Sequence, residues 1–119
     1  MKHYDTSDLR NFAIVGHGAA GKTTLAEAML SLGNEINRMG SVDLGTTVSD
    51  YHPGEKDRKI SIHSTPLHMN WKDIKFNFID APGYSDFIGE SIGSLGVVDM
   101  AAVLIHAVNG IEVGTELMW

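Results

Sequence analysis

The sequence contains no cysteine, which excludes disulfide bonds, thiolate chemistry and cysteine-based zinc sites. It also lacks an excess of basic residues, because nine Lys and Arg stand against fifteen Asp and Glu and the formal net charge is -6. No diffuse basic surface can therefore hold nucleic acid, so we expect no DNA partner and only local contacts with RNA. The longest apolar run, residues 100–105, is far shorter than the ~20 residues that cross a bilayer. The N-terminal residues show no secretory pattern, so we expect a cytoplasmic protein without a membrane partner.

What is present indicates one α/β domain. Hydrophobic residues make up 43% of the 119 residues and charged residues 20%, a profile typical of a globular domain. Apolar patterns predict strands at 12–15, 60–69, 74–80 and 100–108, and helices at 22–31 and 87–97 and from 112 onward. Residues 34–59 lack any period and are broken by glycine and proline, which predicts a long loop.

The arrangement of these elements predicts a mixed, mostly parallel sheet. The strand at 12–15 is a continuous apolar run and the strand at 100–108 begins with one, as expected of strands buried on both faces. Pro66 lies within the strand at 60–69 and places that strand at an edge of the sheet, because proline cannot donate to a ladder. A tight turn at 70–73 predicts an antiparallel hairpin with the strand at 74–80. In the helix at 22–31, Leu25, Ala28, Met29 and Leu32 recur at helical spacing and predict the buried face, with Gly33 ending the helix.

A phosphate-binding motif lies between the first predicted strand and the first predicted helix. It fits the P-loop pattern G-x-x-x-x-G-K-[ST] at every fixed position and consists of Gly16, His17, Gly18, Ala19, Ala20, Gly21, Lys22 and Thr23, followed by Thr24. Small residues let backbone N–H groups surround phosphate oxygens, and the helix N-terminus adds its positive end. Lys22 would then reach the outer phosphates and Thr23 would offer its hydroxyl to Mg²⁺. We expect the His17 side chain to pack against the base of the loop.

A second candidate segment follows the predicted strand at 74–80. Asp80 ends that strand and begins the run Asp80-Ala81-Pro82-Gly83. A P-loop fold places its second magnesium-directed carboxylate at this position, and a glycine there can approach the terminal phosphate. We therefore add Asp80 and Gly83 to the predicted nucleotide site.

Several ordered blocks make the chain resemble the translation factor GTPases, and specifically elongation factor G and its paralogues. The blocks are residues 16–24, residues 50–62, residues 80–90 and residues 110–119. The resemblance implies that the chain is the N-terminal, incomplete portion of a P-loop GTPase domain that uses GTP, GDP and Mg²⁺ on the ribosome. It also implies that residues 34–59 form a switch loop. At the end of that loop, in the run Arg58-Lys59-Ile60-Ser61, Ser61 stands where the family run Arg-Gly-Ile-Thr supplies a magnesium-binding threonine.

The chain departs from the family at three positions of the implied site. Tyr84 replaces the histidine that orients the attacking water in the family's second switch, so the resemblance puts Tyr84 in the catalytic place. Tyrosine is a poor general base near neutral pH but can hydrogen-bond a water. Gly18 and Ala19 replace a branched apolar residue, which helps gate that histidine, and an aspartate linked to a monovalent cation. The Asp-Ala-Pro-Gly-Tyr run resembles a branch of paralogues rather than the main elongation factor G type.

Three functions therefore stay open at this point. The first is a GTPase of the elongation factor G type that acts on the ribosome in a translocation-like step. The second is a nucleotide-dependent binding switch with little hydrolysis, which Gly18, Ala19 and Tyr84 favour. The third is a protein that uses ATP, because the family's base-reading Asn-Lys-x-Asp motif does not occur in these residues.

Overall fold

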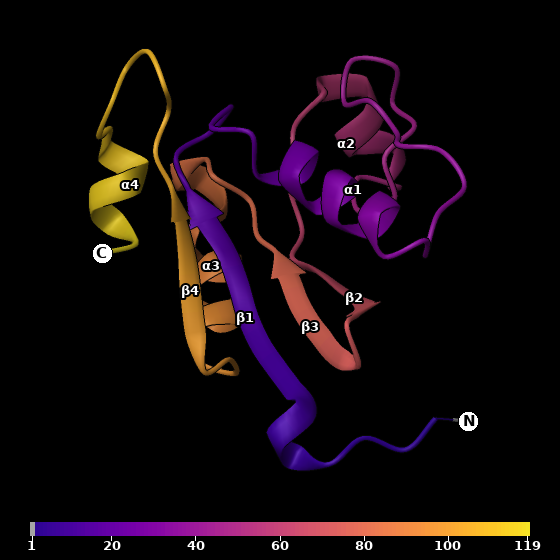
Figure 1. The fold of residues 1–119 in the computed structure, drawn as a ribbon. Helices are drawn as coiled ribbons and strands as arrows, with labels where there is room; N and C mark the ends of the chain where they lie inside the picture. The colour runs from indigo at the N-terminus through magenta and orange to yellow at the C-terminus, as the bar shows by residue number, and fades with distance from the viewer. Residues whose placement is uncertain (1) are drawn as a thin grey trace.

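A computed structural model describes residues 2–119 and arranges four strands in one sheet (Figure 1). Its elements, in chain order, are η1 (Thr6–Asp8), β1 (Leu9–Gly16), α1 (Lys22–Leu32), α2 (Pro53–Arg58), β2 (Thr65–Trp71), β3 (Ile74–Asp80), η2 (Ser85–Phe87), α3 (Ile88–Leu95), β4 (Met100–Leu104) and α4 (Val113–Leu117). None of the helices in residues 2–119 combines the length and the apolar character that a membrane span requires.

The sheet has the strand order β2-β3-β1-β4 and confirms the predicted α/β class. Strand β1 is parallel to both β3 and β4, whereas β2 is antiparallel to β3 and forms an edge. Ile14 of β1 pairs with Asp80 of β3. Because parallel strands end at the same edge of a sheet, the loop after β1 and the loop after β3 begin side by side.

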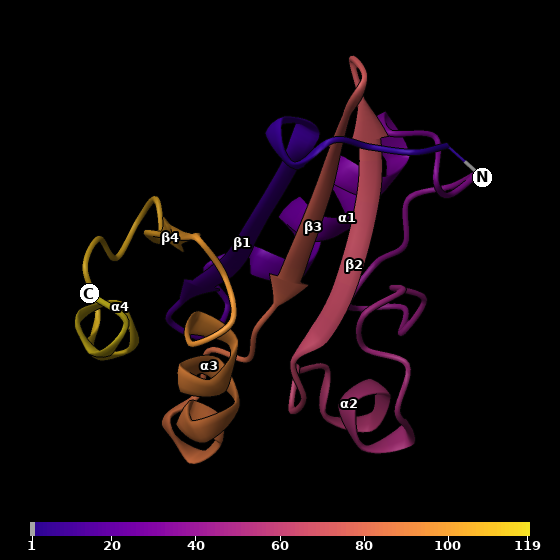
Figure 2. The same ribbon diagram turned by 90° about the horizontal axis from the view of Figure 1, so that it is seen from below.

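Helices cover both faces of the sheet, as Figure 2 shows from below. Ile14 points to one face, where it packs with Ala26 and Leu30 of α1. Ala13 and Val15 point to the other face, where Leu95 of α3 packs against them. This alternation follows from the two-residue period of a strand, and it explains why the centre of β1 is apolar at every position.

The hairpin of β2 and β3 agrees with its sequence signals. Lys72 and Asp73 form the turn and have positive φ angles of 48° and 65°. Two consecutive positive φ angles are typical of a type I′ turn, whose twist matches that of the strands it joins. Pro66 lies on the edge strand β2, the position in a sheet where proline is tolerated.

The buried face of α1 differs from the predicted one. Leu25 and Leu32 are 38% and 54% exposed, whereas Ala26, Glu27 and Leu30 are buried. Lys22 and Thr23 begin the helix and are also buried, so they set its rotation. Residues three and four positions later share their face, and the side chains on that face are therefore covered whatever their polarity.

Four other expectations on secondary structure need correction. Residues 34–59 are not structureless throughout, because Pro53 begins α2 after an N-cap at His52. Strand β2 runs over Thr65–Trp71 rather than 60–69, and β1 is longer than 12–15. Strand β4 covers only Met100–Leu104 of the predicted 100–108 and is not fully buried, since Met100 is 58% exposed.

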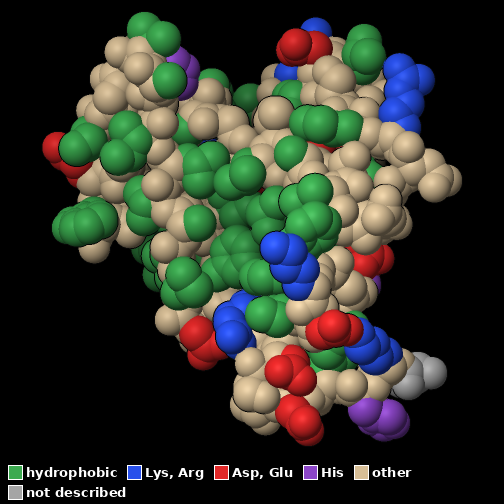
Figure 3. All heavy atoms as spheres, viewed as in Figure 1, with side chains coloured by type: hydrophobic (Ala, Val, Ile, Leu, Met, Phe, Trp, Pro, Cys, Tyr) green, Lys and Arg blue, Asp and Glu red, His purple; other side chains and the backbone are tan. Residues whose placement is uncertain are grey.

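The exposure of β4 follows from its position at an edge of the sheet. Within residues 2–119 its only strand neighbour is β1. Beyond it, Ile105, Val108 and Ile111 are more than half exposed. Figure 3 shows the hydrophobic side chains on this face of the molecule, over the strands and around the C-terminal segment.

Candidate functional site

The P-loop of residues 16–21 connects β1 to α1, and its backbone explains its glycines. Gly16 has φ 140°, and a Cβ there would lie 2.5 Å from the Leu104 carbonyl oxygen of β4. Gly21 is the N-cap of α1 in the left-handed conformation, with φ 95°. Both positions therefore require glycine, for close backbone approach and for positive φ respectively. The result is a loop whose amides precede a helix N-terminus, the usual site for phosphate.

Lys22 is the buried cation of this loop. Its side chain is 6% exposed, and its Nζ donates to the His17 carbonyl oxygen at 2.7 Å. Burial lowers the pKa of Lys22, and the carboxylates of Asp80 and Asp50 oppose that shift. An ammonium held among acidic groups inside a cavity is well placed to meet an anionic ligand.

The three residues predicted to serve Mg²⁺ meet at one point, although they come from different segments. Asp80 is 1% exposed, and its Oδ2 accepts a hydrogen bond from Thr23 Oγ1 at 2.7 Å. The hydroxyls of Thr23 and Ser61 lie 3.0 Å apart. Burial raises the pKa of Asp80 to about 6, although its hydrogen bonds and Lys22 lower it. A cation at this point would stabilise the ionised carboxylate.

Two residues of this cluster received no role from the sequence. Ser49 is 2% exposed and its hydroxyl donates to Asp80 Oδ2 at 2.8 Å. Asp50 is 4% exposed, and burial raises its pKa. The buried oxygens Asp50 Oδ2 and Asp80 Oδ1 have no hydrogen-bond partner within residues 2–119. One sequence signal could have identified Asp50: it begins residues 50–62, one of the segments that resemble the translation factor GTPases.

A cavity of about 320 Å³ opens beside this cluster, within the size range of small-ligand sites. Most of the predicted site residues line it, together with residues of the switch loop: Gly18, Ala19, Gly21, Lys22, Thr23, Thr24, Val42, Asp43, Asp50, Lys59, Ile60, Ser61, Gly83 and Tyr84. Of the predicted residues, Gly16, His17, Ala20 and Asp80 do not line it. Gly16 and Ala20 shape the backbone of the loop, and Asp80 lies behind Thr23.

Gly83 and Tyr84 close the cavity on the side of β3. A Cβ at Gly83 would collide with Lys22 Nζ and would lie 2.7 Å from Gly16 O and from Gly18 N. No side chain larger than hydrogen fits there, as expected of a residue that approaches the phosphates. The Tyr84 ring lies against Gly18 and is 40% exposed.

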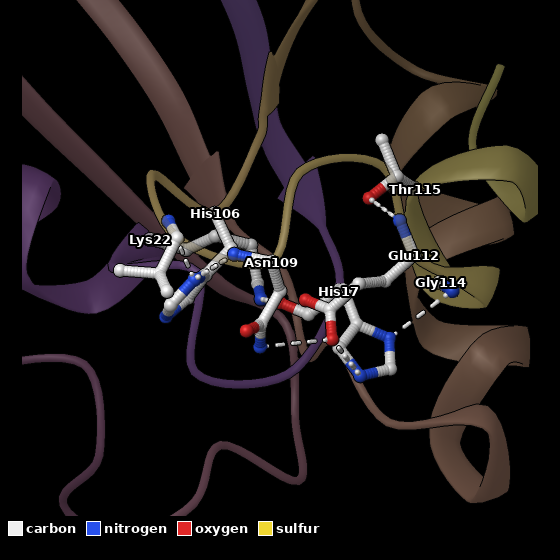
Figure 4. A network of polar contacts seen from close by, with 8 residues as sticks. His17, Lys22, His106, Asn109, Glu112, Gly114 and Thr115 are labelled. Carbon is white, nitrogen blue, oxygen red and sulfur yellow. Dashed lines mark hydrogen bonds and ion pairs between the residues drawn. The ribbon is translucent and has the colours of Figure 1, made fainter.

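The His17 side chain points away from the cavity, toward the C-terminal segment (Figure 4). Its Nδ1 accepts a hydrogen bond from Gly114 N of α4 at 3.1 Å. Its Nε2 lies 3.7 Å from the Glu112 carboxylate, which also accepts a bond from Asn109 Nδ2. The His17 side chain therefore joins the P-loop to α4.

Two buried carboxylates hold the switch loop against the rest of the domain. Glu27 of α1 is 1% exposed and accepts bonds from Gly40 N at 2.7 Å and from Val48 N at 2.5 Å. Glu55 of α2 is fully buried and accepts bonds from the backbone of Ile62 and His63. The loop is thus fastened by hydrogen bonds to charged acceptors, which compensates for its scattered apolar residues.

Comparisons with known proteins identify the family of this chain. Residues 7–119 match the family described as the elongation factor Tu GTP binding domain. The chain is 46% identical to a mitochondrial ribosome-releasing factor 2 of Kluyveromyces lactis over 98% of its own length, and 45% identical to that of Candida dubliniensis over 95%. It covers 15% and 14% of these relatives, so it spans only a small part of each.

Two solved structures are also similar to this chain. A crystal structure of a Thermus thermophilus protein is similar with a TM-score of 0.91 and 40% identity, over 92% of this chain and 17% of that one. A bacterial selenocysteine-specific elongation factor is similar with a TM-score of 0.68 and 25% identity, over 90% of this chain and 16% of that one.

Proposed function

Because the chain belongs to the elongation factor Tu GTP binding domain family, we propose that the protein containing it binds GTP and GDP with Mg²⁺ and hydrolyses GTP on the ribosome. The observation that carries this proposal is that Lys22, Thr23 and Ser61 line one cavity beside the P-loop, while Asp80 accepts a hydrogen bond from Thr23. Each of these side chains has a part in phosphoryl transfer, where the protein positions phosphates and neutralises their charge.

The residues present fit a magnesium ion. Thr23 and Ser61 offer hydroxyl oxygens and Asp80 a carboxylate, and oxygen donors of this kind are the ligands that Mg²⁺ prefers. Asp50 would bind through water, since it lies in the same cavity. The unpartnered buried oxygens of Asp50 and Asp80 support this fit, because a buried polar atom without a partner costs free energy that a bound cation would offset. When bound, Mg²⁺ would neutralise charge on the phosphates.

The other residues have roles in binding and positioning. Lys22 and the loop amides from Gly16 to Thr24 would hold the phosphates, and Gly83 would approach the terminal one. Tyr84 would orient the attacking water through its hydroxyl, in the place of the family's histidine. It would act as a hydrogen-bonding group rather than as a base that removes the proton.

Removal of a proposed magnesium ligand tests the site. We expect Asp80→Asn in the full-length protein to raise the Mg²⁺ concentration needed for GTP binding about tenfold or more, since the amide loses the negative charge. Asp5→Asn is the matched control, because Asp5 is exposed and far along the chain from the site. A titration of labelled GTP at several Mg²⁺ concentrations measures the difference. Equal Mg²⁺ dependence in both variants would contradict the assignment.

The names of the relatives favour a particular activity for the whole protein. Relatives at 45–46% identity are ribosome-releasing factors, so we propose release of ribosomes rather than the translocation-like step first expected. Light scattering of ribosomes mixed with the full-length protein and GTP measures dissociation into subunits, and a tripeptide assay measures translocation. Translocation without dissociation would contradict this choice. The same relatives are mitochondrial, so cell fractionation should test an organellar location of the full-length protein beside the cytoplasmic one.

A binding switch with little hydrolysis is the second candidate, because Gly18, Ala19 and Tyr84 depart from the family pattern. Multiple-turnover hydrolysis of GTP with and without ribosomes separates it from the first. Ribosome-stimulated turnover supports the GTPase, whereas GTP-dependent ribosome binding without turnover supports the switch. Competition between GTP and ATP tests the use of ATP in the same assay.

A further inference from the structure

Gly18 is a glycine that the backbone itself does not require. Unlike Gly16 and Gly21, it has no positive φ angle, so any residue could adopt its conformation. A Cβ built there would nevertheless lie 2.7 Å from Tyr84 Cζ and 2.9 Å from both Cε atoms, and these are its three nearest neighbours. Real Cβ atoms essentially never approach so closely. A side chain at position 18 would therefore displace the Tyr84 ring from its present place.

The Tyr84 side chain has few other restraints. Its backbone precedes η2, and its carbonyl accepts a bond from Phe87 N at 3.0 Å, so the main chain is held. Within residues 2–119 the Tyr84 hydroxyl has no hydrogen-bond partner, and the residue is 40% exposed. The ring atom nearest to a Cβ built at Gly18 is Cζ, which carries that hydroxyl. Contact with Gly18 thus holds the hydroxyl end of the ring at the mouth of the cavity.

We infer that Gly18 is a positioning residue for Tyr84, and that the two form a matched pair in place of the family's branched residue and histidine. This inference rests on the proposed function. The sequence presents Gly18 and Tyr84 as two separate losses, a missing gate and a weaker catalytic group. In the structure they are one arrangement, because the ring occupies the space that a side chain at position 18 would fill.

A cycle of full-length variants tests the pairing: Gly18→Val, Tyr84→His and the double variant. Single-turnover GTP hydrolysis with ribosomes in excess gives the rate, and titration with labelled GTP gives the affinity. We expect Gly18→Val to lower the rate about tenfold or more with affinity changed less than about threefold, since small misplacements near the chemistry cost up to ~100-fold. Gly89→Val is the matched control, because a Cβ at Gly89 meets nothing within 4 Å.

The hydrolysis rate of the double variant, compared with the rates of the two single variants, decides whether Gly18 and Tyr84 act as a pair. We expect the double variant to be faster than Gly18→Val alone, because the smaller imidazole leaves room for a branched neighbour. Independent effects of the two changes, multiplying in the double variant, would overturn the pairing. So would an unchanged rate in Gly18→Val.

A readout that needs no hydrolysis separates this inference from the proposed function. Fluorotyrosine in the full-length protein gives a ¹⁹F resonance for Tyr84, assigned by its loss in Tyr84→Phe. We expect Gly18→Val to shift this resonance and Gly89→Val to leave it in place. If the wild-type protein hydrolyses no GTP, the proposed function fails, but the resonance still tests the contact. A resonance unmoved by Gly18→Val would overturn the pairing whatever the activity.

Discussion

Glu27 should control the order of the switch loop, and its replacement by alanine is the perturbation with the clearest local consequence. Its carboxylate is buried and accepts the backbone N–H groups of Gly40 and Val48, which lie at two separate points of the loop. Glu27→Ala removes both acceptors at once. The loop then keeps its contacts at Ser49 and Glu55 but loses its attachment to α1.

The magnitude follows from the two bonds. A hydrogen bond to a charged acceptor contributes about 1.5–3 kcal/mol, so two bonds give an upper limit of about 6 kcal/mol. Val48 is 41% exposed, and water will replace part of its bond when the carboxylate is absent. We therefore expect the loop to lose about 2–4 kcal/mol, which corresponds to roughly 30-fold to 1,000-fold faster amide exchange if the loop opens locally.

Hydrogen exchange measured residue by residue on the full-length protein without nucleotide is the assay. We expect the amides of Gly40 and Val48 to lose protection in Glu27→Ala, while amides of the β1 core keep theirs. Glu27→Gln should lie between, because its amide offers one oxygen acceptor instead of two. Glu116→Ala is the control on an exposed glutamate of α4. Exchange at Gly40 and Val48 as slow in Glu27→Ala as in the wild-type protein would refute the reasoning. The same data test whether residues 34–59 are ordered in the absence of nucleotide.

Three further predictions concern the cavity. Lys22→Ala should abolish nucleotide binding, because it removes the buried ammonium from the P-loop, whereas the control Lys72→Ala in the β2–β3 turn should not. Equal affinity of the two variants in a labelled GTP titration would contradict the P-loop assignment. Ser61→Ala should raise the Mg²⁺ requirement for GTP by a few-fold, since one hydroxyl ligand is lost, and unchanged Mg²⁺ dependence would argue against this role. In nucleotide-free protein without Mg²⁺, the raised pKa of Asp80 means that its protonation stabilises the fold below about pH 4, a contribution that is lost as pH rises through about 6. Carboxyl ¹³C NMR, assigned with Asp80→Asn, should find the titration near 6, and a value near 4 would show that burial does not dominate.

The sequence by itself determined the P-loop, the α/β class and the antiparallel hairpin. These features rest on short-range rules that leave marks in neighbouring residues. Glycines and Lys22 at set spacing make a phosphate loop, Pro66 identifies an edge strand, and a tight turn joins two strands. A continuous apolar run likewise predicts a central strand, as β1 confirms.

Only the tertiary structure decided which distant residues meet. Ser49 and Asp50 reach the Asp80 cluster because the switch loop folds back over α1, and no local pattern encodes that path. The buried face of α1 follows Lys22 and Thr23 rather than Leu25 and Leu32, because helix rotation is set by the site at its N-terminus.

The pairing of Gly18 with Tyr84 is likewise a property of the folded chain. The two residues are far apart in sequence, and each alone reads as a departure from a family pattern. Parallel pairing of β1 with β3 brings the loops that follow them together, so that a ring from one loop fills the space left free in the other. Side chains in a folded protein fill the space that their spatial neighbours leave free, and the sequence alone does not show which residues are those neighbours.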